Sequence, residues 1–157
     1  MITVRELEPE DDLNTVLTLC KDFFSEYEDH HEEFFDTDNL TDDDISGRFL
    51  ASLKSDTSST IIALEDDIIV GYASISISNQ PGFYKIKRVG NISALMVVPK
   101  YRRKGVATLL IDDSKMFFKK GGVKYYTLFT SHKNEGAIKF YKKINLERLH
   151  VSFLGEV

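Results

Sequence analysis

Apolar and polar residues alternate at the N-terminus and then recur at helical spacing, which predicts one strand followed by two helices. Residues 2–7 alternate as a strand does. The apolar positions from Leu13 to Tyr27 repeat every three or four residues, so we expect a helix there with Pro9 in its first turn. Thr41 and Asp44 have the spacing of a capping box and predict the start of a second helix.

Strands dominate the middle of the chain. Apolar runs at residues 60–64 and 68–77 flank Asp66-Asp67, which favours a hairpin, and Pro81-Gly82 turns the chain into a long strand over residues 86–98.

Strands and helices alternate in the remainder of the chain. We expect a helix from Val106 to a stop at Gly121-Gly122, a strand over 123–130, another helix after Asn134 and a last strand over 146–154. The resulting order, β-α-α-β-β-β-α-β-α-β, predicts an α/β fold of the mixed α+β kind. A mixed sheet would carry helices on both faces.

Composition is that of an ordinary globular protein. The chain has 157 residues, of which 42% are hydrophobic and 29% charged, and we expect one domain spanning residues 1–157. The N-terminus lacks the apolar core of a signal peptide, and no apolar run approaches the roughly 20 residues that a membrane span needs. We therefore expect a cytoplasmic protein without a membrane partner. The net charge of −5 and the absence of an extended basic stripe argue against a nucleic-acid partner.

The most informative motif joins the expected strand over 86–98 to the helix that begins at Val106. The intervening turn is basic and contains R-x-x-G-x-A at residues 102–107. A helix N-terminus offers unpaired N–H groups and a positive dipole end to an anion, and Gly105 lets a bulky ligand approach the backbone. The Walker pattern and the three-glycine dinucleotide pattern are both absent. By itself, a basic loop with one glycine before a helix is more often an ordinary turn.

A second motif follows the expected strand over 123–130. Residues 134–141 read N-x-x-A-x-x-F-Y, and helical spacing brings Asn134, Ala137 and Tyr141 toward one face. Core packing accounts for Phe140. The two motifs in this order resemble those of the GNAT family of N-acetyltransferases. One departure is visible, because Asn145-Leu146 stands where the family usually has Gly-Phe.

The resemblance implies a GNAT-like, mostly antiparallel sheet of six to seven strands. Its fourth and fifth strands would separate to admit the pantetheine arm of acetyl-CoA, the co-substrate. The turn and the start of the next helix would bind pyrophosphate, the fourth strand would pair with the pantetheine amides, and Asn134 would hold that arm or cap its helix. The cofactor-binding residues expected in this way are Leu95, Met96, Val97, Arg102, Arg103, Lys104, Gly105, Val106, Ala107, Thr108, Asn134, Ala137 and Tyr141.

The reaction implied is attack of a primary amine on the thioester, with Tyr141 as the general acid that protonates the leaving thiolate. The general base is unassigned. Relatives often carry an acid about where Ser93 and Ala94 stand, and neither side chain can serve. His132, His30, Glu32 and Glu33 are candidates, and water is an alternative. The lack of an evident base leaves a second hypothesis open, a non-catalytic acyl-CoA-binding or sensing module.

Acidic residues are concentrated in one segment. Residues 22–44 hold eleven acidic residues and no Lys or Arg, whereas the rest of the chain holds 14 acidic and 20 basic residues. Such a lining would attract a cationic acceptor: a polyamine, an aminoglycoside or a lysine side chain. A solvated loop is the alternative. The expected acceptor-binding residues are Tyr27, His30, Glu32, Glu33, Phe34 and Ser93. We expect no metal site, because the adjacent histidines lack a second ligand cluster, and a homodimer is left open.

Overall fold

A computed structural model describes residues 1–28, 34 and 39–157. In this part of the chain five strands form one sheet in the order β1-β2-β3-β4-β5. Neighbouring strands are antiparallel except β4 and β5, which are parallel. The strands are β1 (Ile2–Glu6), β2 (Ser58–Glu65), β3 (Ile68–Asn79), β4 (Arg88–Val97) and β5 (Tyr126–Leu128).

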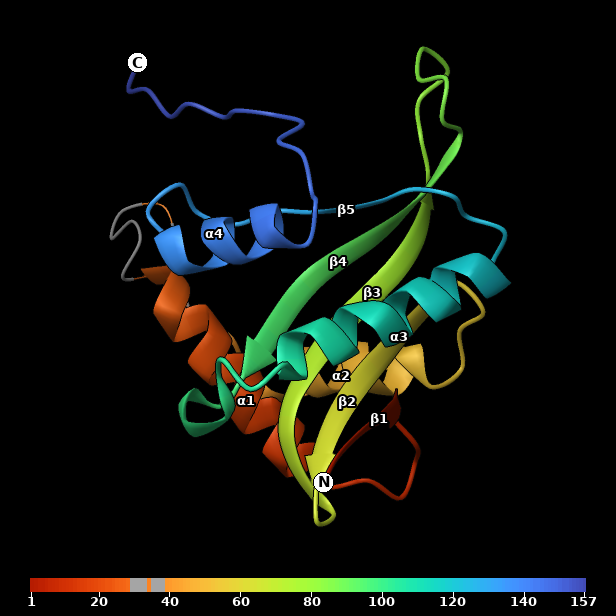
Figure 1. Ribbon diagram of the computed structural model, residues 1–157, viewed down its shortest axis with the longest axis vertical. Helices are drawn as coiled ribbons and strands as arrows, with labels where there is room; N and C mark the ends of the chain where they lie inside the picture. Colours follow the sequence, from red (N-terminus) through yellow and green to blue (C-terminus); the bar gives the residue numbers. More distant parts are fainter. Residues whose placement is uncertain (29–33, 35–38) are drawn as a thin grey trace.

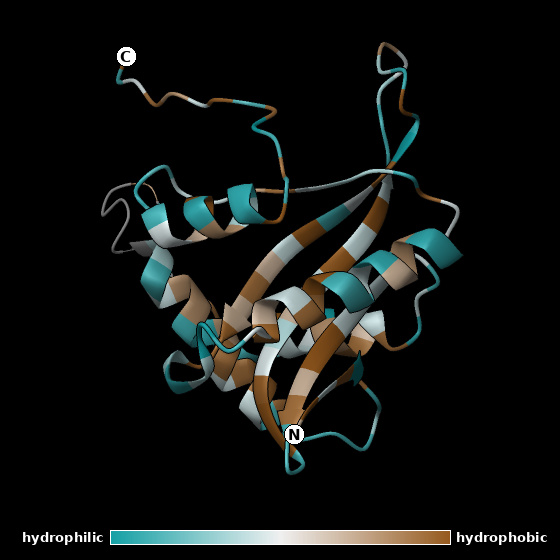
Figure 2. Cartoon of the chain, viewed as in Figure 1, coloured by the Kyte–Doolittle hydropathy of each residue, from teal (hydrophilic) through white to brown (hydrophobic). Residues whose placement is uncertain are grey.

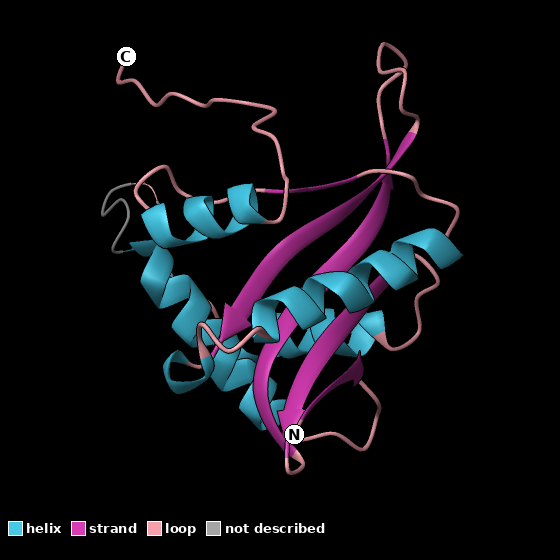
Figure 3. Ribbon diagram, viewed as in Figure 1, coloured by secondary structure: helices cyan, strands magenta, loops and turns pink. Residues whose placement is uncertain are grey.

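Helices cover both faces of this sheet (Figures 1 and 3). The α-helices are α1 (Leu13–Glu28), α2 (Asp42–Ser52), α3 (Val106–Lys120) and α4 (Glu135–Lys143), and a short 3-10 helix, η1 (Pro99–Tyr101), precedes α3. The predicted fold class and the helices on both faces are therefore confirmed. None of the described helices is long and apolar enough to cross a membrane.

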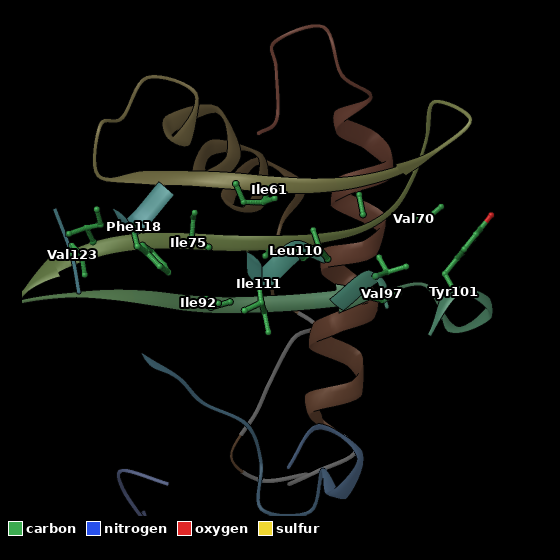
Figure 4. Close-up of a cluster of buried hydrophobic side chains, with 14 residues drawn as sticks. Ile61, Val70, Ile75, Ile92, Val97, Tyr101, Leu110, Ile111, Phe118 and Val123 are labelled. Carbon is green, nitrogen blue, oxygen red and sulfur yellow. The ribbon is translucent and has the colours of Figure 1, made fainter. Parts of the chain in front are cut away.

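Two hydrophobic clusters hold the layers together. One joins α3 to one face of the sheet, and Figure 4 shows Leu110 and Ile111 of α3 near the sheet residues Ile75 and Ile92. The other joins α1 and α2 to the opposite face. Brown apolar bands run along the strands in Figure 2, whereas teal residues lie on the outer sides of α3 and α4.

Burial on both faces explains the uninterrupted apolar sequence of β2. Ile61 and Ala63 belong to the cluster under α3, whereas Ile62 and Leu64 belong to the cluster under α1 and α2. All four side chains are buried. A strand with two covered faces has no solvent side, so polar alternation disappears.

Local turn and capping chemistry agrees with the sequence at two predicted points. Asp66 and Asp67 both have positive φ angles, 50° and 64°, which is the conformation of a two-residue type I′ hairpin turn. Thr41 caps α2, because its Oγ1 accepts a hydrogen bond from the Asp44 N–H and donates one to the Asp44 carboxylate.

The start of α1 differs from the prediction. Pro9 lies in a turn, and the helix begins at Leu13. The turn is held by Asp11, whose carboxylate accepts two hydrogen bonds from the Arg5 guanidinium at 2.6 and 2.7 Å. Asp12 then accepts hydrogen bonds from the N–H groups of the first helical residues, so the cap follows Pro9 by three residues.

The predicted last strand is wrong, and so is the predicted count of six to seven strands. Residues 147–157 form no strand in the structure, and the blue C-terminal segment runs away from the sheet (Figure 1). Leu149, Val151 and Phe153 alternate as strand residues do, yet all three are exposed. Apolar alternation favours a strand only where a neighbouring edge pairs with it, and none of the five strands of the sheet pairs with this segment.

Candidate active site

The sheet opens between β4 and β5. Their parallel pairing consists of Gly90 with Tyr126, Asn91 with Thr127 and Ile92 with Leu128. The Asn91 amide fixes this junction through two hydrogen bonds. Its Nδ2 donates to Ser78 Oγ at 2.9 Å, and its Oδ1 accepts from Thr127 Oγ1 at 3.0 Å. Beyond it the two strands diverge, as Figure 1 shows. The separation expected between the fourth and fifth strands is present, and we call it the fork.

A β-bulge lies on β4 where the fork begins. Ile92 pairs with Ile75 and Ala94 pairs with Ser74, so Ser93 is the extra residue. Its Oγ donates to the Ser74 carbonyl at 3.2 Å. The bulge changes which backbone groups of β4 face the fork.

Beyond the bulge, alternate residues of β4 direct their backbone groups into the fork. The Val98 N–H donates to the Val70 carbonyl on β3. Backbone groups of successive residues in an antiparallel strand point to alternate edges, so those of Leu95 and Val97 point away from β3, toward the fork. Met96 pairs with Tyr72 of β3. Of the three residues expected to contact pantetheine, Leu95 and Val97 therefore direct backbone groups toward the fork, whereas the backbone of Met96 faces β3.

A cavity of roughly 510 Å³, including its open mouth, occupies the fork. Its walls come from α1, β4, the end of β5 and α4. The lining residues are Phe23, Glu26, Tyr27, Ile92, Ser93, Ala94, Leu95, Leu128, Phe129, Thr130, Asn134, Ala137 and Tyr141. The structure therefore brings Tyr27, Ser93 and Leu95 together with all three expected residues of the second motif.

Tyr141 reaches the cavity from α4. Burial, together with the nearby Tyr27 and Tyr126, raises the pKa of Tyr141 to about 12. The phenol consequently keeps its proton at neutral pH and can donate a hydrogen bond into the cavity. Burial also raises the pKa of Tyr27, whose ring lies edge-on to Phe129 with the ring centroids 6.2 Å apart.

Asn134 caps α4 and lines the cavity at the same time. Its Oδ1 accepts a hydrogen bond from the Ala137 N–H at 3.1 Å, which is the cap expected at this position. The capping oxygen leaves the amide nitrogen as a donor. Phe140 packs against the cluster beneath α3, in agreement with its expected core role.

The turn after β4 presents a row of free donors. Gly105 is the N-cap of α3 with a φ of 86°, and Arg103 also has a positive φ of 62°. Within the described chain, none of the N–H groups of residues 103–108 donates to a backbone or side-chain acceptor. A Cβ added at Gly105 would meet no atom within 4 Å, so the surface there is open. These features suit an anion such as pyrophosphate.

The basic side chains of the turn have different surroundings. Lys104 places its ammonium 5.3 Å from the centre of the Tyr101 ring, and Arg103 is exposed. Arg102 instead turns back along β4, where its Nε donates to the Val97 carbonyl at 2.8 Å. Its Nη2 forms an ion pair with Glu26 of α1. The Arg102 guanidinium therefore connects the turn to α1. Because it already donates to the Val97 carbonyl, that carbonyl is occupied and is not a free acceptor at the edge of β4.

The expected acceptor residues have three outcomes. Tyr27 and Ser93 line the cavity. Phe34 is not part of that lining, and its side chain is 60% exposed. His30, Glu32 and Glu33 lie outside the described residues. His132, a candidate base, is exposed and does not line the cavity.

Several lining residues were missed in the sequence. Glu26 follows Phe23 by three positions and precedes Tyr27, so helical spacing is a signal that could have placed it beside the apolar stripe of α1. Phe129 and Thr130 are the last two residues of the strand predicted over 123–130. Because β5 ends at Leu128, both residues lie beyond the pairing and contribute to the cavity wall.

Comparison with known proteins agrees with this geometry. Residues 17–145 match the acetyltransferase (GNAT) family. The chain belongs to the GNAT family. It is 31% identical over 110 residues to an N-alpha-acetyltransferase of Saccharolobus solfataricus, a match that covers 66% of this chain and 65% of the relative. It is also 34% identical over 65 residues to an uncharacterised N-acetyltransferase of Methanocaldococcus jannaschii, covering 41% of this chain and 29% of that protein.

The chain thus spans less than two thirds of the length of either of these GNAT relatives. Among solved structures, the aminoglycoside N-acetyltransferase AAC(6')-Iy, in complex with a bisubstrate analogue of CoA, superimposes with a TM-score of 0.79. The two chains are 21% identical, and the superposition covers 100% of this chain and 99% of that one. This similarity extends the GNAT fold over the whole described chain.

Proposed function

We propose that this protein is an N-acetyltransferase that moves the acetyl group of acetyl-CoA to a primary amine of a small, positively charged acceptor. The observation that carries the proposal is the fork. Its cavity holds Tyr141 and the free edge of β4, and β4 leads directly to the free N–H groups of residues 103–108. The solved relative that binds a CoA-containing bisubstrate analogue supports acetyl-CoA as the donor.

The residues would hold acetyl-CoA along one continuous path. The N–H groups at the start of α3 would bind its pyrophosphate, and the Leu95 backbone would pair with its pantetheine amides. The Val97 N–H also faces the fork. The thioester would then lie in the cavity near Ser93 and Tyr141, where a backbone N–H of β4 can polarise its carbonyl.

The reaction requires a neutral amine and a stabilised thiolate. An alkylamine with a pKa of about 10.4 is neutral in roughly one molecule in 2,500 at pH 7, so it must first lose a proton. The amine nitrogen then bonds to the carbonyl carbon, the C–S bond breaks, and the thiolate receives a hydrogen bond or proton from Tyr141. The nitrogen's surplus proton goes to water, because no imidazole lines the described cavity and its one carboxylate is paired with Arg102.

That pairing also supports the alternative of a non-catalytic acyl-CoA-binding module. The two functions separate in a thiol-release assay with acetyl-CoA and a panel of polyamines, aminoglycosides, amino acids and peptides. We expect amine-dependent thiol release above the rate of thioester hydrolysis. Calorimetric binding of CoA without release for any amine would instead support the sensing module. Absence of both binding and release would reject the assignment of the fork as a CoA site.

A further inference from the structure

Glu26 has a distinct position in the cavity. It is the single charged side chain among the described lining residues, and it stands on the α1 wall with the aromatic residues Phe23 and Tyr27. Its side chain is 47% exposed, so a solute entering from solvent can reach it. The remaining walls carry neutral side chains.

Arg102 holds the Glu26 carboxylate in one orientation. The Arg102 Nη2 donates to Glu26 Oε1 at 2.5 Å, while Nε of the same guanidinium is anchored on the Val97 carbonyl. Oε2 of Glu26 accepts no hydrogen bond from the described residues. One oxygen is thus fixed by the protein, and the other is available to a cation.

Aromatic rings line the same cavity as this carboxylate. The Phe23 and Tyr27 rings lie 5.0 Å apart between centroids, and the Tyr27 ring meets that of Phe129 across the cavity. Ring faces attract an ammonium group, and a carboxylate oxygen accepts its hydrogen bonds. A cavity that holds a carboxylate and aromatic rings is therefore suited to an alkylammonium.

We propose that Glu26 binds a second, permanently charged ammonium of the acceptor, so that the substrate is a di- or polyamine rather than a monoamine. The attacking nitrogen must be neutral, whereas the group on Glu26 stays protonated, and a single amine cannot satisfy both conditions. This inference rests on the proposed acetyl transfer. Arg102 is a positioning residue, because it acts through Glu26.

The test compares linear diamines with monoamines of the same chain length, using wild type, Glu26→Gln and Asp22→Asn. Asp22 is an exposed carboxylate one turn earlier on α1 and does not line the cavity, so its variant controls for loss of one negative charge. We expect wild type to prefer diamines. Glu26→Gln should lower kcat/KM for diamines about tenfold, the low end for a hydrogen bond to a charged group at a half-exposed site.

Asp22→Asn should keep the wild-type preference for diamines, whereas Glu26→Gln should lose the preference for a diamine over the monoamine of the same chain length. If wild type acetylates amines but shows no diamine preference, or Glu26→Gln retains it, the Glu26 assignment is overturned while the proposed function stands. If wild type acetylates none of them, the proposed function fails. In that case, calorimetric titration of a diamine tests the ammonium site without turnover. If wild type and Glu26→Gln bind the diamine with equal affinity, the ammonium site is overturned as well.

Discussion

Replacing Tyr141 with phenylalanine tests the assigned acid most directly. The change keeps the ring, and so the packing of α4 against the cluster beneath α3, and removes only the hydroxyl. The folded structure and the affinity for CoA should therefore change little, by no more than about one hydrogen bond, or 0.5–1.5 kcal/mol. The effect should fall on kcat.

The size of the effect follows from the raised pKa of the phenol. With a pKa of about 12 for Tyr141 and about 8.5 for an alkyl thiol, complete proton transfer to the thiolate is uphill by roughly 3.5 pKa units, or about 5 kcal/mol. Full transfer is therefore a poor route. A hydrogen bond to the developing thiolate contributes about 1.5–3 kcal/mol, so kcat should fall about 10- to 100-fold.

The same pKa sets the pH dependence. Tyr141 loses its proton only near pH 12, so its ionisation should produce no fall in kcat between about pH 6 and 10. The assay is single-turnover thiol release, which isolates chemistry from product release, with the exposed Tyr125→Phe variant as control. An unchanged single-turnover rate in Tyr141→Phe would refute the acid role. A descending limb near pH 9 that disappears in this variant would refute the raised pKa.

Two glycines provide further predictions. Gly105→Asp places a carboxylate among the free N–H groups at the start of α3, so calorimetry should show at least about a tenfold loss of CoA affinity. Gly122→Asp, also at a positive φ and in open space, should bind as wild type, and equal affinity for all three proteins would contradict the anion site. Gly90→Ala brings a Cβ within 2.6–2.8 Å of the Phe118 ring, so denaturant unfolding should show a loss of about 1–3 kcal/mol, and an unchanged midpoint would mean that the ring moves freely.

Elements with strong local signals were predicted well. The Asp66-Asp67 turn and the Thr41 cap are set by residues adjacent in the chain, and the helix of the first motif starts and stops where Gly105 and Gly121-Gly122 predict. Both motifs were found because each combines a backbone conformation with particular side chains. The fork itself was expected only from the family resemblance.

Features that depend on distant partners were not predictable. The exposed C-terminal segment has the alternation of a strand, and no periodicity shows whether an edge is available to pair with it. The bulge at Ser93 reverses the direction of the β4 backbone groups, yet a serine in an apolar run has no signature of a bulge. Glu26 becomes a site residue through Arg102, which is 76 positions away in the sequence.

The fork also has a consequence for local unfolding. Three residue pairs join β5 to β4, and α4 has no buried residue, whereas β1 to β4 share two buried clusters. The region from β5 through α4 should thus open at a lower free energy than β1 to β4, and its amide hydrogens should exchange before those of β1 to β4. A ligand that contacts both β4 and α4 would connect the region from β5 through α4 to the sheet formed by β1 to β4. Its binding free energy would then appear mainly as slower exchange in β5 and α4, so bound substrate would stabilise a region that has little packing of its own.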